Sequence, residues 1–143
     1  MSGEVMAAQA EAELQAALLS AMRADSGVQA QLGTPARLFD GETDGAVYPF
    51  AVLERHEVRA NGSIGSAGQA HTFSFGARSR FGGRHAAMDV VASLRAAIEQ
   101  ASPDLTYQNI ILIQTIYCDV MRTPDLTAFR GVLRVRVITE EAG

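Results

Sequence analysis

Residues 109–122, which read NIILIQTIYCDVMR, are the most β-rich stretch of the chain and decide its fold. A strand of this length spans roughly 40 Å at about 3.4 Å per residue, and few small domains contain one. After a turn at residues 123–125, the segment 128–139 alternates in character. One of its faces carries Phe129, Gly131, Leu133, Val135 and Val137. A period of two is typical of a half-buried strand, so the chain is expected to end in a long antiparallel hairpin.

Further strands and two helices are expected upstream of this hairpin. Residues 69–78 alternate around His71, Phe73 and Phe75, residues 48–58 form an apolar strand, and residues 37–39 form a short one. Helices are expected at residues 4–24 and 84–101 from their apolar stripes, with a short turn at residues 28–32. The order predicts an α+β fold: a single-layer antiparallel β-sheet with two α-helices packed on one face. We expect one domain over residues 1–143, with a flexible N-terminus of a few residues.

A glycine-rich segment separates two of these strands. Residues 61–68 contain Gly62, Gly65 and Gly68 and no charge, which predicts a mobile loop at about residues 60–69. Two interpretations stay open. The loop is either a flexible connection or a segment that orders on meeting a partner, through Asn61, Gly62, Ile64, Gly65 and Gly68.

The composition excludes several functions. The chain has 143 residues and a formal net charge of −4, and all 12 of its strong bases are arginines. An acidic chain is a poor candidate for sequence-independent nucleic-acid binding or for a membrane surface, and the absence of lysine excludes Schiff-base chemistry and the standard P-loop. No apolar run approaches the length of a membrane span, and the N-terminus does not read as a targeting signal. A single cysteine fits a reducing cytoplasm.

Candidate catalytic residues are few. His56, His71 and His85 have no His or Cys neighbour at zinc-binding spacing, so no metal or cofactor is expected. His71 is expected to be a partly buried strand histidine, His85 a surface or capping residue, and Cys118 an inert core residue. An alternative is a small α+β enzyme or ligand-binding protein that uses His71 or His56 as a base.

Arginines line one face of the last strand. Arg130, Arg134 and Arg136 alternate with apolar residues, and Asp119 on the preceding strand, Glu140 and Glu141 are candidate partners. Either these arginines form local ion pairs on a solvated face, or the face packs against another subunit through arginine hydrogen bonds. A GC-rich genome also explains arginine in place of lysine.

Several segments in order resemble a known family. They are the helix at residues 14–23, the strand beginning Tyr48-Pro49-Phe50, the block at residues 71–80 that leads into Gly83-Arg84, and Thr123-Pro124-Asp125 followed by residues 130–136. Together they resemble the short prophage-type tail-completion proteins, which include the tail terminator of gene transfer agents and relate to the terminators of long-tailed phages. The resemblance covers residues 14–140.

The resemblance implies a structural protein of a phage-like particle. It implies a ring, usually of six copies, at the head–tail junction, which is assembled in the bacterial cytoplasm. The ring would stop growth of the tail tube and bind the major tail tube protein and the head–tail connector, with DNA passing only in transit. The alternative within the same particle is a head-completion or stopper protein. A six-membered ring would carry six times the subunit's charge of −4, which suits a channel for DNA.

Overall fold

A computed structural model describes residues 3–61 and 68–142 of the chain. The elements, in order, are α1 (Gly3–Ala24), α2 (Ser26–Leu32), β1 (Leu38–Phe39), β2 (Phe50–Ala60), β3 (Gly68–Ser79), α3 (Gly83–Gln100), β4 (Gln108–Arg122) and β5 (Phe129–Glu141). The α+β class is confirmed, and the long helices and strands begin and end within two residues of the expected positions.

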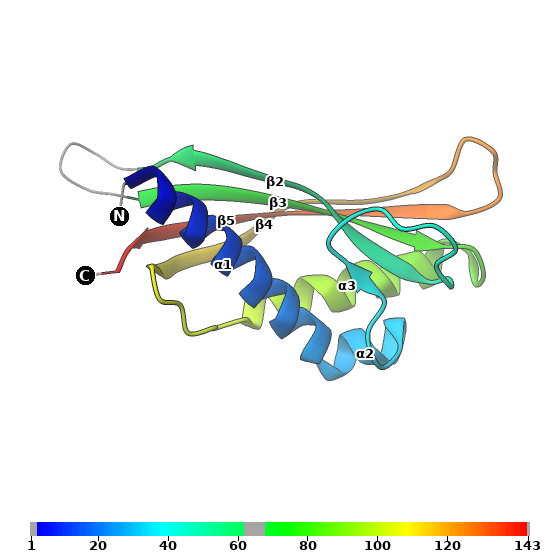
Figure 1. Ribbon diagram of the computed structural model, residues 1–143. Helices are drawn as coiled ribbons and strands as arrows, with labels where there is room; N and C mark the ends of the chain where they lie inside the picture. The colour runs from blue at the N-terminus through cyan, green and yellow to red at the C-terminus, as the bar shows by residue number, and fades with distance from the viewer. Residues whose placement is uncertain (1–2, 62–67, 143) are drawn as a thin grey trace.

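The strands form one sheet in the order β1-β2-β3-β5-β4 (Figure 1). The pairs β2–β3, β3–β5 and β5–β4 are antiparallel, as expected. The sheet is nevertheless mixed, because β1 runs parallel to β2 through the pairs Leu38↔Ala51 and Phe39↔Val52. The connection between them is long enough to return the chain to the same end of the sheet, so the two strands run in one direction.

The three helices of the described residues lie on one face of the sheet, and within these residues the other face carries none (Figure 1). α3 packs across β3, β4 and β5, and α1 and α2 pack against α3. The core therefore lies between the sheet and the helices, and the alternation of β3 and β5 places apolar side chains in it. Its largest fully buried members include Phe73, Phe75, Leu133, Leu94 and Leu14.

Two local features shape this helical layer. The short turn expected at residues 28–32 is a full helix, α2, because the Asp25 carboxylate accepts a hydrogen bond from the Val28 amide at 3.0 Å and caps its first turn. Gly131 of β5 lies directly under α3, where a Cβ atom would collide with Val91 Cγ2. Glycine at this position therefore lets the helix approach the sheet closely.

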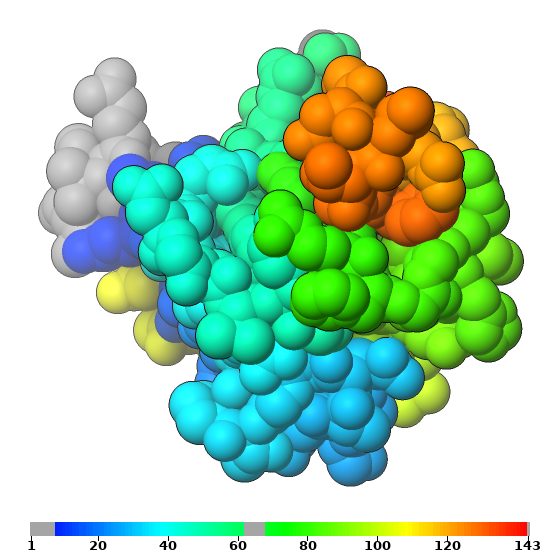
Figure 2. Space-filling model, turned by 90° about the vertical axis from the view of Figure 1, so that its right-hand side faces the viewer, coloured from blue at the N-terminus to red at the C-terminus, as the bar shows by residue number. Residues whose placement is uncertain are grey.

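α1 begins and β5 ends at the same end of the sheet, and the β4–β5 turn lies at the other (Figure 1). Seen from that other end, the β4–β5 turn, in orange, and α2, in light blue, stand on opposite sides of the molecule (Figure 2). Within the described residues, no helix is long and apolar enough to cross a membrane.

Candidate assembly surfaces

The helix-free face of the sheet carries six of the chain's 12 arginines. Strand alternation and register place them there, and we call this surface the arginine face: Arg55, Arg59, Arg78, Arg130, Arg134 and Arg136. The acidic strand residues on the same face are Glu54, Glu57, Asp119 and Glu140. The chain is acidic overall, yet this face holds an excess of positive charge.

A single carboxylate ties three strands of the arginine face together. Glu54 lies at a β-bulge of β2, between Leu53 and Arg55. It accepts hydrogen bonds from Arg130 Nη2 at 2.6 and 2.9 Å and from Arg78 Nη2 at 3.0 Å. Partial burial alone would raise the pKa of Glu54, but the hydrogen bonds and charges of Arg130 and Arg78 outweigh it and lower the pKa. Glu54 therefore stays ionised and links β2, β3 and β5.

Arg134 and Arg136 are placed differently from Arg130. Arg134 Nε donates a long hydrogen bond of 3.4 Å to Ser74 Oγ, and its guanidinium lies over the Tyr117 ring, 5.3 Å from the centroid. Across the part of the chain that the structure describes, neither Arg134 nor Arg136 forms an ion pair. Their charges are thus available to a partner, whereas that of Arg130 is already paired.

The prediction that Asp119, Glu140 and Glu141 pair with the arginines of β5 was wrong. Asp119 lies opposite Val132 in the β4–β5 register and accepts a hydrogen bond from the Tyr117 hydroxyl at 3.1 Å. Glu140 and Glu141 are at the far end of β5 from Arg130 and form no ion pair among the described residues. The actual partner, Glu54, reaches across β3 from a bulge. A bulge and a strand order of this kind leave no local signal in the sequence.

A groove of about 510 Å³ crosses the arginine face. Arg55, Glu57 and Arg59 of β2 form one side, Arg134 and Arg136 of β5 form the other, and the small side chains of β3 form its floor. The groove is wide and open and holds one carboxylate against four guanidinium groups. It is suited to contact with a carboxylate-bearing or phosphate-bearing surface.

Only the two ends of the glycine-rich segment fall within the described residues. The Asn61 amide donates to the Gly68 carbonyl at 3.0 Å and continues the β2–β3 ladder. A Cβ atom on Gly68 would lie 2.6 Å from the Asn61 carbonyl oxygen, so glycine permits this close pairing. Gly62, Ile64 and Gly65, which the sequence proposed as contact residues, lie outside the described residues.

The histidines do not form an open catalytic site. His71 lies in strand β3, as expected, but is fully and not partly buried, and its Nδ1 lies 2.8 Å from His56 Nε2. Burial and then the neighbouring His56 lower the pKa of His71 to about 4, and burial lowers the pKa of His56. His85 is on the surface beside Asp89, as expected. The described residues hold no cluster of three or more His, Cys, Asp or Glu side chains that could bind a metal.

The expectation for Cys118 was wrong. Cys118 is exposed, because β4 is an edge strand that α3 covers only in part. A long apolar run was interpreted as core, but of the residues of β4 only Gln108 is buried. The exposed large apolar side chains of this strand are Ile111, Leu112, Ile116, Tyr117 and Met121.

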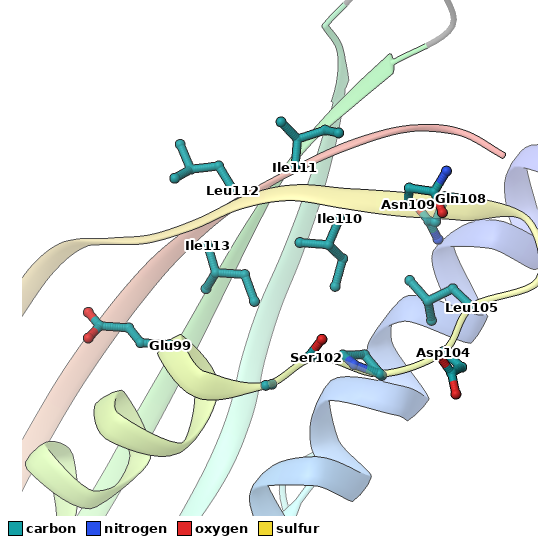
Figure 3. A pocket seen from close by; sticks show the side chains of 12 residues that line it. Glu99, Ser102, Asp104, Leu105, Gln108, Asn109, Ile110, Ile111, Leu112 and Ile113 are labelled. Carbon is teal, nitrogen blue, oxygen red and sulfur yellow. The ribbon is translucent and has the colours of Figure 1, made fainter.

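A second groove, of about 460 Å³, lies where β4 begins, beside the segment that connects it to α3 (Figure 3). In this view Ile110 and Ile113 point toward the helices, while Ile111 and Leu112 point away from them. Ile110 and Ile113 pack against the core, and Ile111 is 55% and Leu112 46% exposed. The groove thus belongs to the same exposed strand.

These features define a class of protein. The reactive side chains are buried or isolated, whereas a charged sheet face and a long apolar edge strand are open, as in a structural subunit that binds other proteins. Comparison with known families identifies the kind of structural subunit. The chain matches Tail completion protein gp17 over residues 16–140 and belongs to that family. It is a structural protein of virion assembly and not an enzyme, as its resemblance to tail-completion proteins predicted.

A comparison with solved structures gives a similar fold. A chain from the virion of a native gene transfer agent (GTA) particle superposes with a TM-score of 0.81 at 22% sequence identity. The match covers 92% of this chain and 97% of that chain. No curated protein matches the sequence.

Proposed function

We propose that this tail completion protein forms a closed ring, of six copies, that ends the growth of the tail tube at the head–tail junction. The ring would bind the tube protein on one side and the head–tail connector on the other, with DNA passing through the opening. The observation that carries the proposal is the near-complete structural overlap with a chain of a gene transfer agent virion, within a family of tail completion proteins.

The exposed surfaces support such a role. A closed ring needs two unlike patches on each subunit, because the front of one copy meets the back of the next. The charged arginine face and the apolar outer edge of β4 are chemically unlike and belong to the same sheet. We assign the subunit or partner contacts to Arg134 and Arg136, whose charges are unpaired, and to the segment from Asn61 to Gly68. Arg130, already paired with Glu54, contributes indirectly by holding the face in shape.

The test is negative-stain microscopy of the protein mixed with its tail tube protein. Capped tubes of limited length would support a terminator, and tubes that grow without limit would overturn it. Particles from a deletion strain separate the terminator from a stopper. Loss of a terminator leaves abnormally long or unattached tails, whereas loss of a stopper leaves heads that leak DNA.

A further inference from the structure

We infer that neighbouring copies join edge to edge, with β4 of one subunit pairing with the second half of β2 of the next. This interface rests on the proposed ring and specifies how it closes. It would continue the sheet from one subunit into the next.

β4 is an open edge strand of 15 residues. It pairs with β5 on one side, and the other side has no strand partner among the described residues. Asp119 and Arg122 are its only charged residues, and it contains no proline. Proteins usually protect long edges with charge, proline or a covering element, because open backbone groups pair with other chains. An edge this apolar and this long is expected to be covered in the assembled state.

The opposite edge of the sheet is open as well. β1 covers only Ala51 and Val52 of β2. From Arg55 to Ala60, β2 pairs with β3 alone, its side chains are half-buried or exposed, and within residues 3–61 and 68–142 no other backbone bonds to its free side. One subunit therefore carries two unlike free edges on opposite sides of one sheet.

The strand directions favour a head-to-tail arrangement. The three pairings between β2 and β4 are all antiparallel, so β4 runs opposite to β2. Placing β2 of a second copy beside β4 therefore gives an antiparallel pair like the others. Because the two edges differ, each copy presents a free edge to the next copy. The row of copies closes into a ring when the rotation between neighbouring copies permits it. Bulges in both strands, at Glu54 and around Ile116, bend and twist them, as closure into a ring requires.

The side chains point to one register. On the helix-free face, Asp119 of β4 would stand opposite Arg55 of β2. Counting along both strands, with the bulge at Ile116 retained, then puts Tyr117 opposite Glu57 and Gln114 opposite Arg59. Each pair joins opposite charges or a hydrogen-bond donor to an acceptor, and such cross-strand pairs stabilise a sheet. This complementarity favours a second copy of the chain as the occupant of both edges.

Short-range cross-linking tests this register. In a Cys118→Ser background, chains carrying Arg55→Cys and Asp119→Cys are incubated with the tube protein and treated with a short bis-maleimide. We expect a covalent ladder that ends at the ring size. A matched chain with Arg55→Cys and Met88→Cys is the control, because Met88 is 50% exposed but lies on α3. All the altered side chains are exposed, and circular dichroism checks that the variants fold.

A second variant probes the edge itself. Ile116→Lys adds a charge to a side chain that is 47% exposed, so it should leave the monomer folded and abolish capping, while Met88→Lys should leave capping intact. Two results would overturn the edge interface without affecting the proposed ring: capped tubes that give no cross-linked ladder, and capping by Ile116→Lys at the level of the unaltered protein. If the unaltered protein caps no tubes and forms no oligomer, the ring itself falls, and this interface with it.

Discussion

Acidification should destabilise the protein through the buried His71. Its pKa is about 4 in the fold, against 6.5 for an ordinary histidine, because it is buried and faces His56. The unfolded chain therefore binds a proton at a pH where the folded chain does not, and the free energy of unfolding falls as the pH drops from 6.5 toward 4. At about 1.4 kcal/mol per pKa unit, the loss is about 3 kcal/mol. The lowered pKa of His56 acts in the same direction.

The hydrogen bonds around His71 explain why both rings stay neutral. His56 Nδ1 lies 3.2 Å from Gln15 Oε1, which only accepts, so His56 donates there and accepts from His71 Nδ1 at Nε2. His71 Nε2 is then free to accept from the Thr139 hydroxyl at 3.3 Å. A second proton on His56 would put two N–H groups face to face. The arrangement joins α1, β2, β3 and β5, and acid loosens that junction.

The assay is urea unfolding at a series of pH values for the natural protein and for His71→Gln. The variant should lose about 3 kcal/mol less between pH 6.5 and 4, whatever its stability at neutral pH. His85→Gln, on the surface, should follow the natural protein. Equal pH slopes for the natural protein and His71→Gln would refute the reasoning, as would an NMR titration of the His71 ring near 6.5.

Three further outcomes are expected. Replacing Arg134 and Arg136 together by Ala should weaken ring assembly, seen as fewer capped tubes in micrographs; unchanged assembly would leave genome composition as the explanation for these arginines. Glu54→Gln should lower the free energy of unfolding by about 1–2 kcal/mol in urea titrations, since it weakens a carboxylate clasp across three strands; no change would mean that the clasp is fully solvated. Gly131→Ala should cost about 1–3 kcal/mol because the new methyl group collides with α3, while Gly41→Ala, with open space around it, should cost little. Equal thermal midpoints for these two variants would contradict the close helix–sheet contact.

The sequence predicted the helices, the long strands and the buried face well, because each depends on a periodic pattern. The alternation around Phe73 and Phe75 and the stripe along α3 are local signals, and the structure buries both sets of side chains. The face to which each side chain of a strand points can therefore be predicted without knowing the order of the strands.

Strand order and edges could not be predicted in the same way. Nothing within β4 shows that it has a neighbour on one side only, so its apolar residues suggested a core and Cys118 was placed inside it. The partner of Arg130 was missed for the same reason: Glu54 lies 76 positions away and meets it only because β3 runs between them and β2 bulges. Long-range pairing decides both features.

The net charge of −4 averages over two unlike halves of the molecule. Three arginines of the arginine face are taken up by nearby carboxylates: Arg78 and Arg130 by Glu54, and Arg55 by Glu57. Arg59, Arg134 and Arg136 are left, so one subunit neutralises about three phosphates at most, and the electrostatic affinity from so few contacts is small. If this face lines the channel, it would touch passing DNA weakly and release it. Local ion pairing therefore already limits how strongly the arginine face binds DNA. The net negative charge of the chain is not needed to prevent tight binding.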